Sequence, residues 1–149
     1  MKNNRGFSLL ELLIVVAIIL IIATIAIPSL LRSRQAANES SAVANLRTIN
    51  TAEVTYLSSA GGNFGTINDL VTAGLIDSRF TAGNPPVSGY TFSVAAALSD
   101  YTGTATPSST NAGRYGYWST PDAVVRYASA TSSTCNPCYP TGFSGMPVQ

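Results

Sequence analysis

Two features of this 149-residue chain could carry chemistry: the pair Cys135 and Cys138, and the lone acid Glu11 inside an apolar run. A Cys-x-x-Cys pair can be a redox motif, half of a zinc site or a small disulfide loop. Redox use needs the first thiol at a helix N-terminus, whereas Pro137 and Pro140 lie in a tail without a helical pattern. Zinc needs two further ligands, and the chain has no histidine and no other cysteine. The residues therefore favour a disulfide clamp, with redox use and free thiols as alternatives, and a disulfide indicates an oxidising compartment.

Glu11 stands out because the residues that follow it belong in a membrane. Between Leu12 and Ile27 the only polar residue is Thr24, and none is charged. A carboxylate at membrane depth costs about 2.5–3.5 kcal/mol on insertion scales, so it needs a partner and marks a functional site by default. No cation lies within one helical turn of Glu11. We therefore expect its partner to come from the chain end or from another molecule.

The composition argues against several classes of function. Charged residues make up 10% of the chain and the formal net charge is +1, without a block of like charge. A nucleic-acid partner would need clustered Lys and Arg, so none is predicted. The absence of histidine removes the commonest general base and the commonest metal ligand. With few carboxylates and no nucleophile motif, we predict that the protein is not an enzyme, and no cofactor or metal is predicted.

The apolar run from Phe7 to Leu31 is long enough to cross about 30 Å of hydrocarbon as a helix. It is longer than the apolar region of a signal peptide, and no small-residue cleavage site follows it. In lipid, only a helix satisfies the backbone of a single span. Pro28 should weaken or kink this helix, although proline is also simply common in membrane helices. Basic residues flank the run on both sides, so the positive-inside rule is nearly balanced. We place the N-terminus in the cytoplasm mainly because the cysteine-bearing part should lie outside.

The helical pattern continues to about residue 60, where Gly61 and Gly62 end it. Its repeating stripe consists of Ala42, Leu46, Ile49, Glu53 and Tyr56. Glu53 is an exception in this stripe that the pattern does not explain. A short helix is expected over residues 66–76, with Thr66 or Asn68 as its cap and Gly74 at its end.

Four strands are predicted in the second half of the chain, from the alternation of aromatic and polar residues. They are Tyr90–Ala95, Tyr101–Thr106, Tyr115–Ser119 and Val124–Ala128. The last two should form a hairpin across the turn at residues 120–123. An antiparallel sheet of this kind needs one face covered, and the stripe on the long helix can cover it. The fold class predicted is therefore α+β.

The run Gly6-Phe7-Ser8-Leu9-Leu10-Glu11-Leu12-Leu13, after a short basic leader and before a long apolar helix, closely resembles the motif of the type IV pilin and type II secretion pseudopilin superfamily. The resemblance implies that a membrane peptidase cuts between Gly6 and Phe7 and that the same enzyme N-methylates Phe7. It implies that Glu11 then meets the new amine of Phe7 on a neighbouring subunit. Pro28 matches a proline that is common in the family.

The implied architecture is a pilin-like lollipop, in which a long N-terminal helix packs its second half on a four-stranded antiparallel sheet. Residues 1–6 would be a prepilin leader, residues 7–31 the membrane-spanning and filament-core helix, and residues 32–149 a globular head. The implied partners are identical subunits in a helical filament, the prepilin peptidase and methyltransferase, an inner-membrane assembly platform with a cytoplasmic ATPase, and membrane lipid before assembly. The subunit would sit in the inner membrane before assembly, with its N-terminus in the cytoplasm. After assembly it would be part of a periplasmic or cell-surface filament.

The alternative within the superfamily is a major pseudopilin of a type II secretion system. Such proteins often carry an acidic calcium loop near the C-terminus, whereas no Asp or Glu follows Asp122 here, which favours a pilin. The pair Cys135 and Cys138 resembles the C-terminal disulfide loop of many pilins, although its spacing is far tighter. Outside the superfamily, a membrane-anchored monomer is possible, but it leaves Glu11 unexplained.

Overall fold

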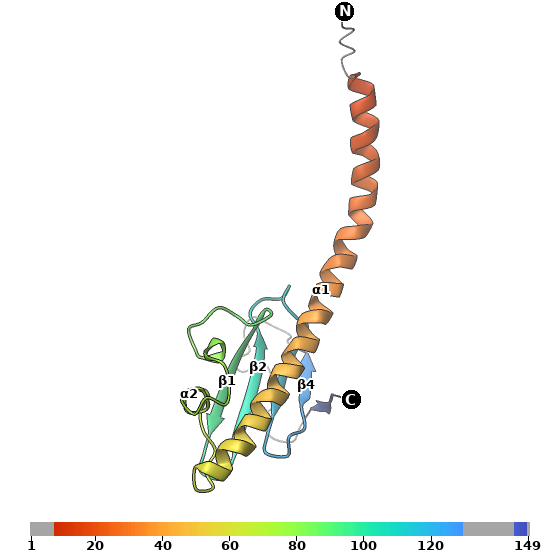
Figure 1. Ribbon diagram of the computed structural model, residues 1–149. Coiled ribbons are helices and arrows are strands. Elements are labelled where there is room, and N and C mark those ends of the chain that lie inside the picture. The colour runs from red at the N-terminus through yellow and green to blue at the C-terminus, as the bar shows by residue number, and fades with distance from the viewer. Residues whose placement is uncertain (1–7, 130–144, 149) are drawn as a thin grey trace, which may run out of the picture. The chain divides into compact units, whose positions relative to one another are not determined.

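The computed structural model describes residues 8–129 and 145–148 of the chain. The chain forms two compact units, Met1–Arg34 and Gln35–Gln149, and helix α1 (Leu9–Ser59) begins in the first and ends in the second (Figure 1). The helix continues without interruption past Pro28. The expectation that the helical pattern extends to about residue 60 is confirmed.

The second unit contains one antiparallel sheet whose strands follow the order of the chain. The strands are β1 (Tyr90–Ala96), β2 (Tyr101–Pro107), β3 (Tyr115–Ser119), β4 (Arg126–Ser129) and β5 (Met146–Pro147). The α+β class is confirmed, but across the described residues the sheet has five strands where four were predicted. The additional strand is β5, which is only two residues long and therefore has no readable alternation.

The predicted hairpin between β3 and β4 is confirmed, since these strands pair from Tyr115 with Ser129 to Trp118 with Arg126. The turn is closed by the backbone N–H of Ala123, which donates to the carbonyl oxygen of Thr120 at 2.9 Å. Strand β4 begins two residues later than predicted because residues 124 and 125 follow this turn outside the regular ladder.

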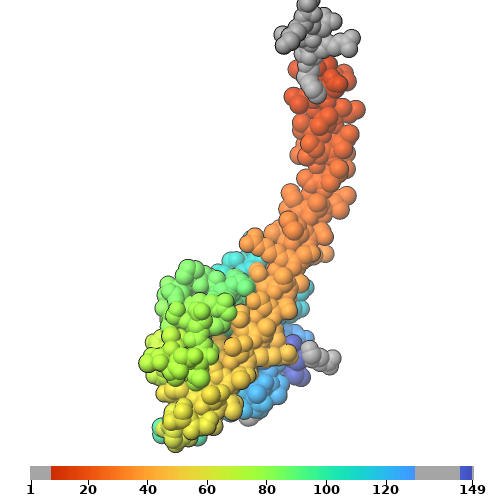
Figure 2. Space-filling model, in the orientation of Figure 1, coloured from red at the N-terminus to blue at the C-terminus, as the bar shows by residue number. Residues whose placement is uncertain are grey.

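The core of the second unit lies between the second half of α1 and one face of the sheet (Figure 1). The stripe is confirmed, because Ala42, Leu46 and Ile49 are fully buried, and burial of a large aliphatic side chain contributes about 1.5–3 kcal/mol. A side chain added at Gly103 of β2 would lie 3.4 Å from Leu46 Cδ1. This glycine, with Ala105 two residues along, lets the helix lie close to the central strands. The opposite side of α1 remains uncovered on the face seen in Figure 2.

Two short helices connect α1 to the sheet. Helix α2 (Ile67–Thr72) starts at Thr66, whose side chain accepts the N–H of Asp69 while the Asp69 side chain accepts the N–H of Thr66. This reciprocal cap satisfies two donors that a helix start leaves free. The helix is shorter than the predicted range 66–76, and a turn with Gly74 at φ +71° follows it. The 3₁₀ helix η1 (Ser78–Phe80) was not predicted.

Candidate functional site

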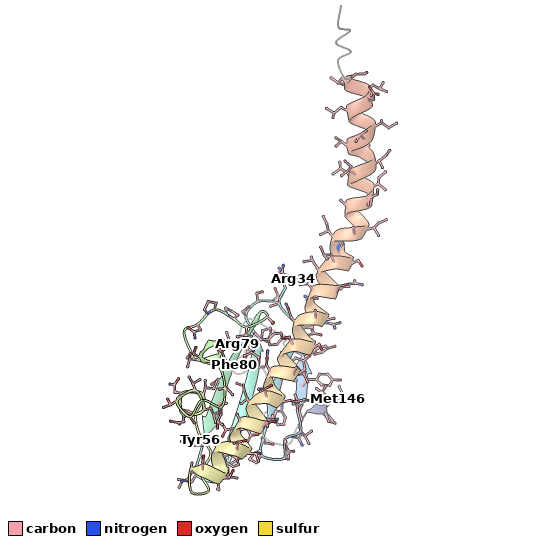
Figure 3. All side chains as sticks on the ribbon, in the orientation of Figure 1. Arg34, Tyr56, Arg79, Phe80 and Met146 are labelled. Carbon is pink, nitrogen blue, oxygen red and sulfur yellow. The ribbon has the colours of Figure 1, made fainter. Side chains whose placement is uncertain are left out.

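The first unit presents an apolar surface on every side of the helix. From Leu9 to Leu31 all large apolar side chains are exposed, and Figure 3 shows them radiating around the helix axis. By length and composition α1 is apolar enough to cross a membrane, and no part of its most apolar window is buried. A soluble monomer rarely exposes a contiguous apolar patch larger than a few hundred Å², so this surface marks a site of contact with lipid or protein.

Thr24, the polar residue within this surface, has its hydrogen-bonding need met by its own helix. Its hydroxyl donates to the carbonyl oxygen of Ile21 at 2.8 Å. A hydroxyl satisfied in this way can enter an apolar environment at little cost. Thr24 therefore does not call for a partner outside the helix.

Glu11 differs from Thr24 in this respect. It lies in the first turn of α1, where the partial positive charge of the helix N-terminus favours a carboxylate. Within residues 8–129 and 145–148, neither a hydrogen bond nor an ion pair is made by its side chain. The helix terminus supplies only part of the stabilisation that a full charge needs in an apolar environment. Within the described residues, the Glu11 carboxylate thus lacks a partner for its charge.

Pro28 lies inside α1, about four residues after Thr24. A proline has no N–H, so the carbonyl oxygen of Thr24 receives no helical hydrogen bond from position 28. The helix is locally weakened there although its path is continuous. This position is the natural place for α1 to bend or loosen.

Four of the predicted site residues lie outside the described residues: Gly6 and Phe7 at the expected cleavage point, and Cys135 and Cys138 of the expected disulfide. Their roles remain predictions. Of the sequence-predicted site, the structure therefore places Glu11 and Pro28, both on the first unit.

The second unit holds two carboxylates whose partners the sequence patterns did not identify. Glu39, on the second unit's part of α1, accepts from the backbone N–H of Arg114 at 2.7 Å and from its guanidinium at 3.0 and 3.2 Å. Glu53 is fully buried and accepts the backbone N–H of Gly65 at 3.1 Å. These partners are 75 and 12 residues away in sequence, so no local spacing could have shown them.

Burial affects the hydroxyls of two tyrosines in the second unit. Burial, with a contribution from the nearby Glu53 carboxyl, raises the pKa of Tyr101 to about 12. Burial and the charge of Glu39 raise the pKa of Tyr117 to about 12. Both hydroxyls therefore stay protonated at neutral pH, and that of Tyr101 donates to Asn50 Oδ1 at 3.0 Å. Among the described residues, no cluster of three or more His, Cys, Asp or Glu side chains could hold a metal ion.

Comparison with known proteins places the clearest similarity at the N-terminus. Residues 1–27 match the family model of the prokaryotic N-terminal methylation motif. Over 56 residues, the chain is 46% identical to the type IV major pilin protein of Myxococcus xanthus, a match that covers 38% of this chain and 26% of that protein. Over 46 residues, it is 52% identical to the major component of the type IV wide pilus of Thermus thermophilus, covering 31% of this chain and 35% of that protein.

The matched segments thus span about a quarter and about a third of these two relatives. No solved structure matches the chain. The resemblance to type IV pilins is confirmed, and residues 1–27 of this chain carry a prokaryotic N-terminal methylation motif.

Proposed function

We propose that this protein is the structural subunit of a type IV pilus-like filament. The observation that carries the proposal is the first unit's helix, which is apolar on all sides, exposed throughout and marked by the single acid Glu11. A bilayer would cover this surface before assembly, and the helices of identical subunits would cover it afterwards. The similarity to two type IV pilus proteins supports this reading.

In this proposal residues 1–6 are a leader that a prepilin peptidase removes, and the same enzyme methylates the new N-terminus at Phe7. Processing creates an amine close to the start of the apolar helix. The Glu11 carboxylate of a neighbouring subunit would pair with this amine and set the register between subunits. Pro28 would let the helix loosen as it leaves the membrane. Cys135 and Cys138 would form a disulfide in the oxidising compartment outside the inner membrane.

The subunit would work with an assembly platform and a cytoplasmic ATPase, as a structural protein without catalytic activity. Its N-terminus would face the cytoplasm before assembly. The second form of the proposal is a major pseudopilin of a secretion system, which would use the same helix and the same Glu11 pairing. The two forms differ in whether long surface fibres are made.

The test is the intact mass and N-terminal sequence of protein sheared from the cell surface. The proposal expects a chain that begins at N-methylated Phe7. The variant Gly6→Val serves as the control, because a side chain at this position should block the peptidase and leave the leader attached. An uncut wild-type chain found only in the membrane would overturn the filament proposal. A processed chain that forms no surface fibres would favour the pseudopilin.

A further inference from the structure

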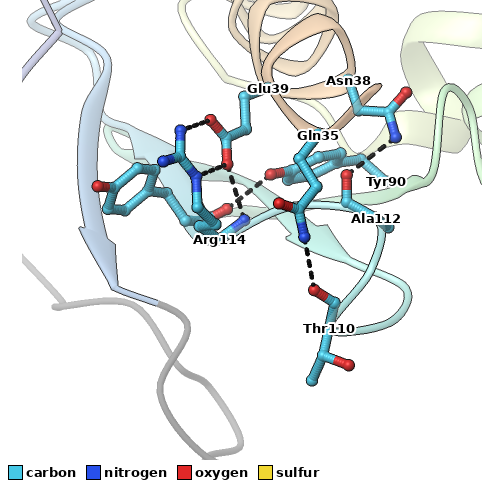
Figure 4. A network of polar contacts seen from close by, with 8 residues as sticks. Gln35, Asn38, Glu39, Tyr90, Thr110, Ala112 and Arg114 are labelled. Carbon is cyan, nitrogen blue, oxygen red and sulfur yellow. Dashed lines mark hydrogen bonds and ion pairs between the residues drawn. The ribbon is translucent and has the colours of Figure 1, made fainter. Parts of the chain in front are cut away.

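The second unit fastens the beginning of its helix through a set of polar contacts. Three side chains of α1 reach the loop between β2 and β3, as Figure 4 shows. Gln35 Nε2 donates to the carbonyl oxygen of Thr110 at 3.1 Å, and Asn38 Nδ2 donates to that of Ala112 at 2.9 Å. Glu39 accepts from the backbone N–H of Arg114 and from the Nε and Nη2 atoms of its guanidinium.

These contacts precede the apolar packing along the helix. Buried apolar side chains of α1 begin at Ala42, whereas Gln35 is half-buried and residues 36 and 37 are exposed. The last hydrogen bond in this stretch joins the side chain of Ser41 to that of Ser88 at 3.0 Å. Along α1, the polar contacts of residues 35–41 thus come first. The buried apolar side chains that begin at Ala42, here called the apolar seam, follow them.

The loop that receives these contacts is itself held firmly in place. Tyr90 is fully buried and its hydroxyl donates to the carbonyl oxygen of Tyr115 at 2.8 Å. The backbone N–H and the hydroxyl of Ser108 both donate to the carbonyl oxygen of Gly89 at 2.9 Å. A side chain at Gly89, where φ is +77°, would approach Ala112 Cβ to 3.0 Å and Asn38 Nδ2 to 3.1 Å. The fastening therefore depends on a close approach of backbone, loop and helix.

We propose that Gln35, Asn38 and Glu39, together with residues 110–114, form a polar latch that can open and close while the core of the second unit stays folded. Opening exposes hydrogen-bonding groups that water can satisfy in exchange: the Arg114 side chain is already 56% exposed, and the Glu39 side chain, 9% exposed in the closed latch, gains access to water. The apolar seam from Ala42 onward has no such exchange available, so it stays closed. When α1 separates from the rest of the second unit, beginning at residue 35, the latch would therefore decide how far along the helix the separation extends. This inference does not depend on the filament proposal.

The test is hydrogen–deuterium exchange of the full chain in detergent, followed by mass spectrometry. Latch opening is read at the amides of residues 39–45, whose helical hydrogen bonds go to the carbonyls of residues 35–41. Loss of the charge pair in Glu39→Gln or in Arg114→Gln should speed exchange there about 5-fold or more, which corresponds to roughly 1 kcal/mol. Exchange at residues 49–57, over the apolar seam, should stay unchanged.

Arg47→Gln is the matched control, since it removes an exposed cation from the same helix at a position outside the latch. The double variant of Glu39 and Arg114 should exchange no faster than either single variant, because both substitutions open the same contact. Wild-type protein gives an independent reading: raising salt from about 0.1 M to about 1 M shortens the screening length from about 10 to about 3 Å and should speed the same amides. Unchanged exchange at 39–45, or an equal increase at 49–57, would overturn the latch.

Discussion

The carboxylate of Glu53 accepts the backbone N–H of Gly65, twelve residues further along the chain, at 3.1 Å. This bond ties the last turns of α1 to the loop before α2. The other carboxylate oxygen, Glu53 Oε1, is buried and has no hydrogen-bond partner among the residues that the structure describes. A buried oxygen without a partner favours the neutral form of the acid.

The first prediction concerns the pH dependence that follows from this arrangement. Burial raises the pKa of Glu53 above its ordinary value of 4.5, the Gly65 N–H opposes this, and the charge of Asp69 adds to it. The folded state therefore keeps this proton at pH values where the unfolded chain has lost it. The resulting stabilisation is fully present below about 4.5 and is lost as pH rises through the folded-state pKa. Glu53→Gln should remove this part of the slope of unfolding free energy against pH.

Trp118 makes the measurement specific, since it is the only tryptophan of the chain and is fully buried in β3. Its fluorescence during denaturant unfolding at several pH values reports the second unit. Asp122→Asn is the matched control: hydrogen bonding from Arg126 lowers the pKa of Asp122 below 3.8, so its stabilisation is lost only as pH falls below that range. An unchanged slope above pH 4.5 in Glu53→Gln would show that Glu53 is charged in the folded protein.

The second prediction contrasts two identical substitutions on one helix. Leu46 is fully buried against Gly103, whereas Leu30 is 70% exposed on the first unit. Leu46→Ala should lower the free energy of unfolding of the second unit by about 2–5 kcal/mol, because it leaves a cavity in the core. Leu30→Ala should leave the Trp118 transition within about 0.5 kcal/mol of wild type. Equal effects of the two substitutions would contradict the assignment of the core.

The third prediction concerns the contact between Tyr90 and Gly113. A Cβ added at Gly113 would lie 1.9 Å from the Tyr90 hydroxyl oxygen, which already donates to Tyr115. Gly113→Ala should therefore destabilise the second unit by about 1–3 kcal/mol through overpacking. Tyr90→Phe alone should cost about 0.5–1.5 kcal/mol for the lost hydrogen bond.

Because the hydroxyl is the nearest obstacle, the double variant of Tyr90 and Gly113 should lose less stability than the sum of the two single variants. Denaturant unfolding of all four proteins gives this coupling directly. Strict additivity would mean that the loop moves away from Tyr90 without cost.

The sequence patterns predicted those parts of the fold that depend on neighbours in the chain. The spacing of Ala42, Leu46 and Ile49 is a property of one helix, and the alternation of buried and exposed residues in β1 is a property of one strand. Strand β3 was also predicted from alternation, but its residues 116–119 are all buried. Glu53 interrupted the apolar stripe without an explanation because its partner is the backbone of a loop. Glu39 and Arg114 are 75 residues apart, so their pairing depends on the completed fold. Strand β5 has two residues and takes its conformation from pairing with β4, not from its own composition.

The candidate site likewise has one part that the sequence could indicate and another part that only the structure shows. Glu11 could be identified from sequence because the cost of a charge among apolar residues does not depend on tertiary structure. The structure adds that Thr24 satisfies its own hydroxyl, which separates two polar residues that composition alone treats alike. The partner proposed for Glu11 is the amine of Phe7 on a neighbouring subunit, which exists only after the leader is removed, so a single unprocessed chain cannot show the pairing.

The last prediction tests that partner. Glu11→Ala should leave processing at Gly6 intact but lower the yield of sheared surface filament about 10-fold or more, the effect of losing roughly 1.4 kcal/mol at a docking step. Processing is read from the mass of the membrane-bound chain, and assembly from the amount of sheared fibre. Thr24→Ala is the control on the same helix, since its hydroxyl bonds only to Ile21 and its loss should leave fibre yield unchanged. If Glu11→Ala assembled at the wild-type level, the proposed pairing with the amine of Phe7 would be wrong, and the exposed apolar surface alone would have to set the register between subunits.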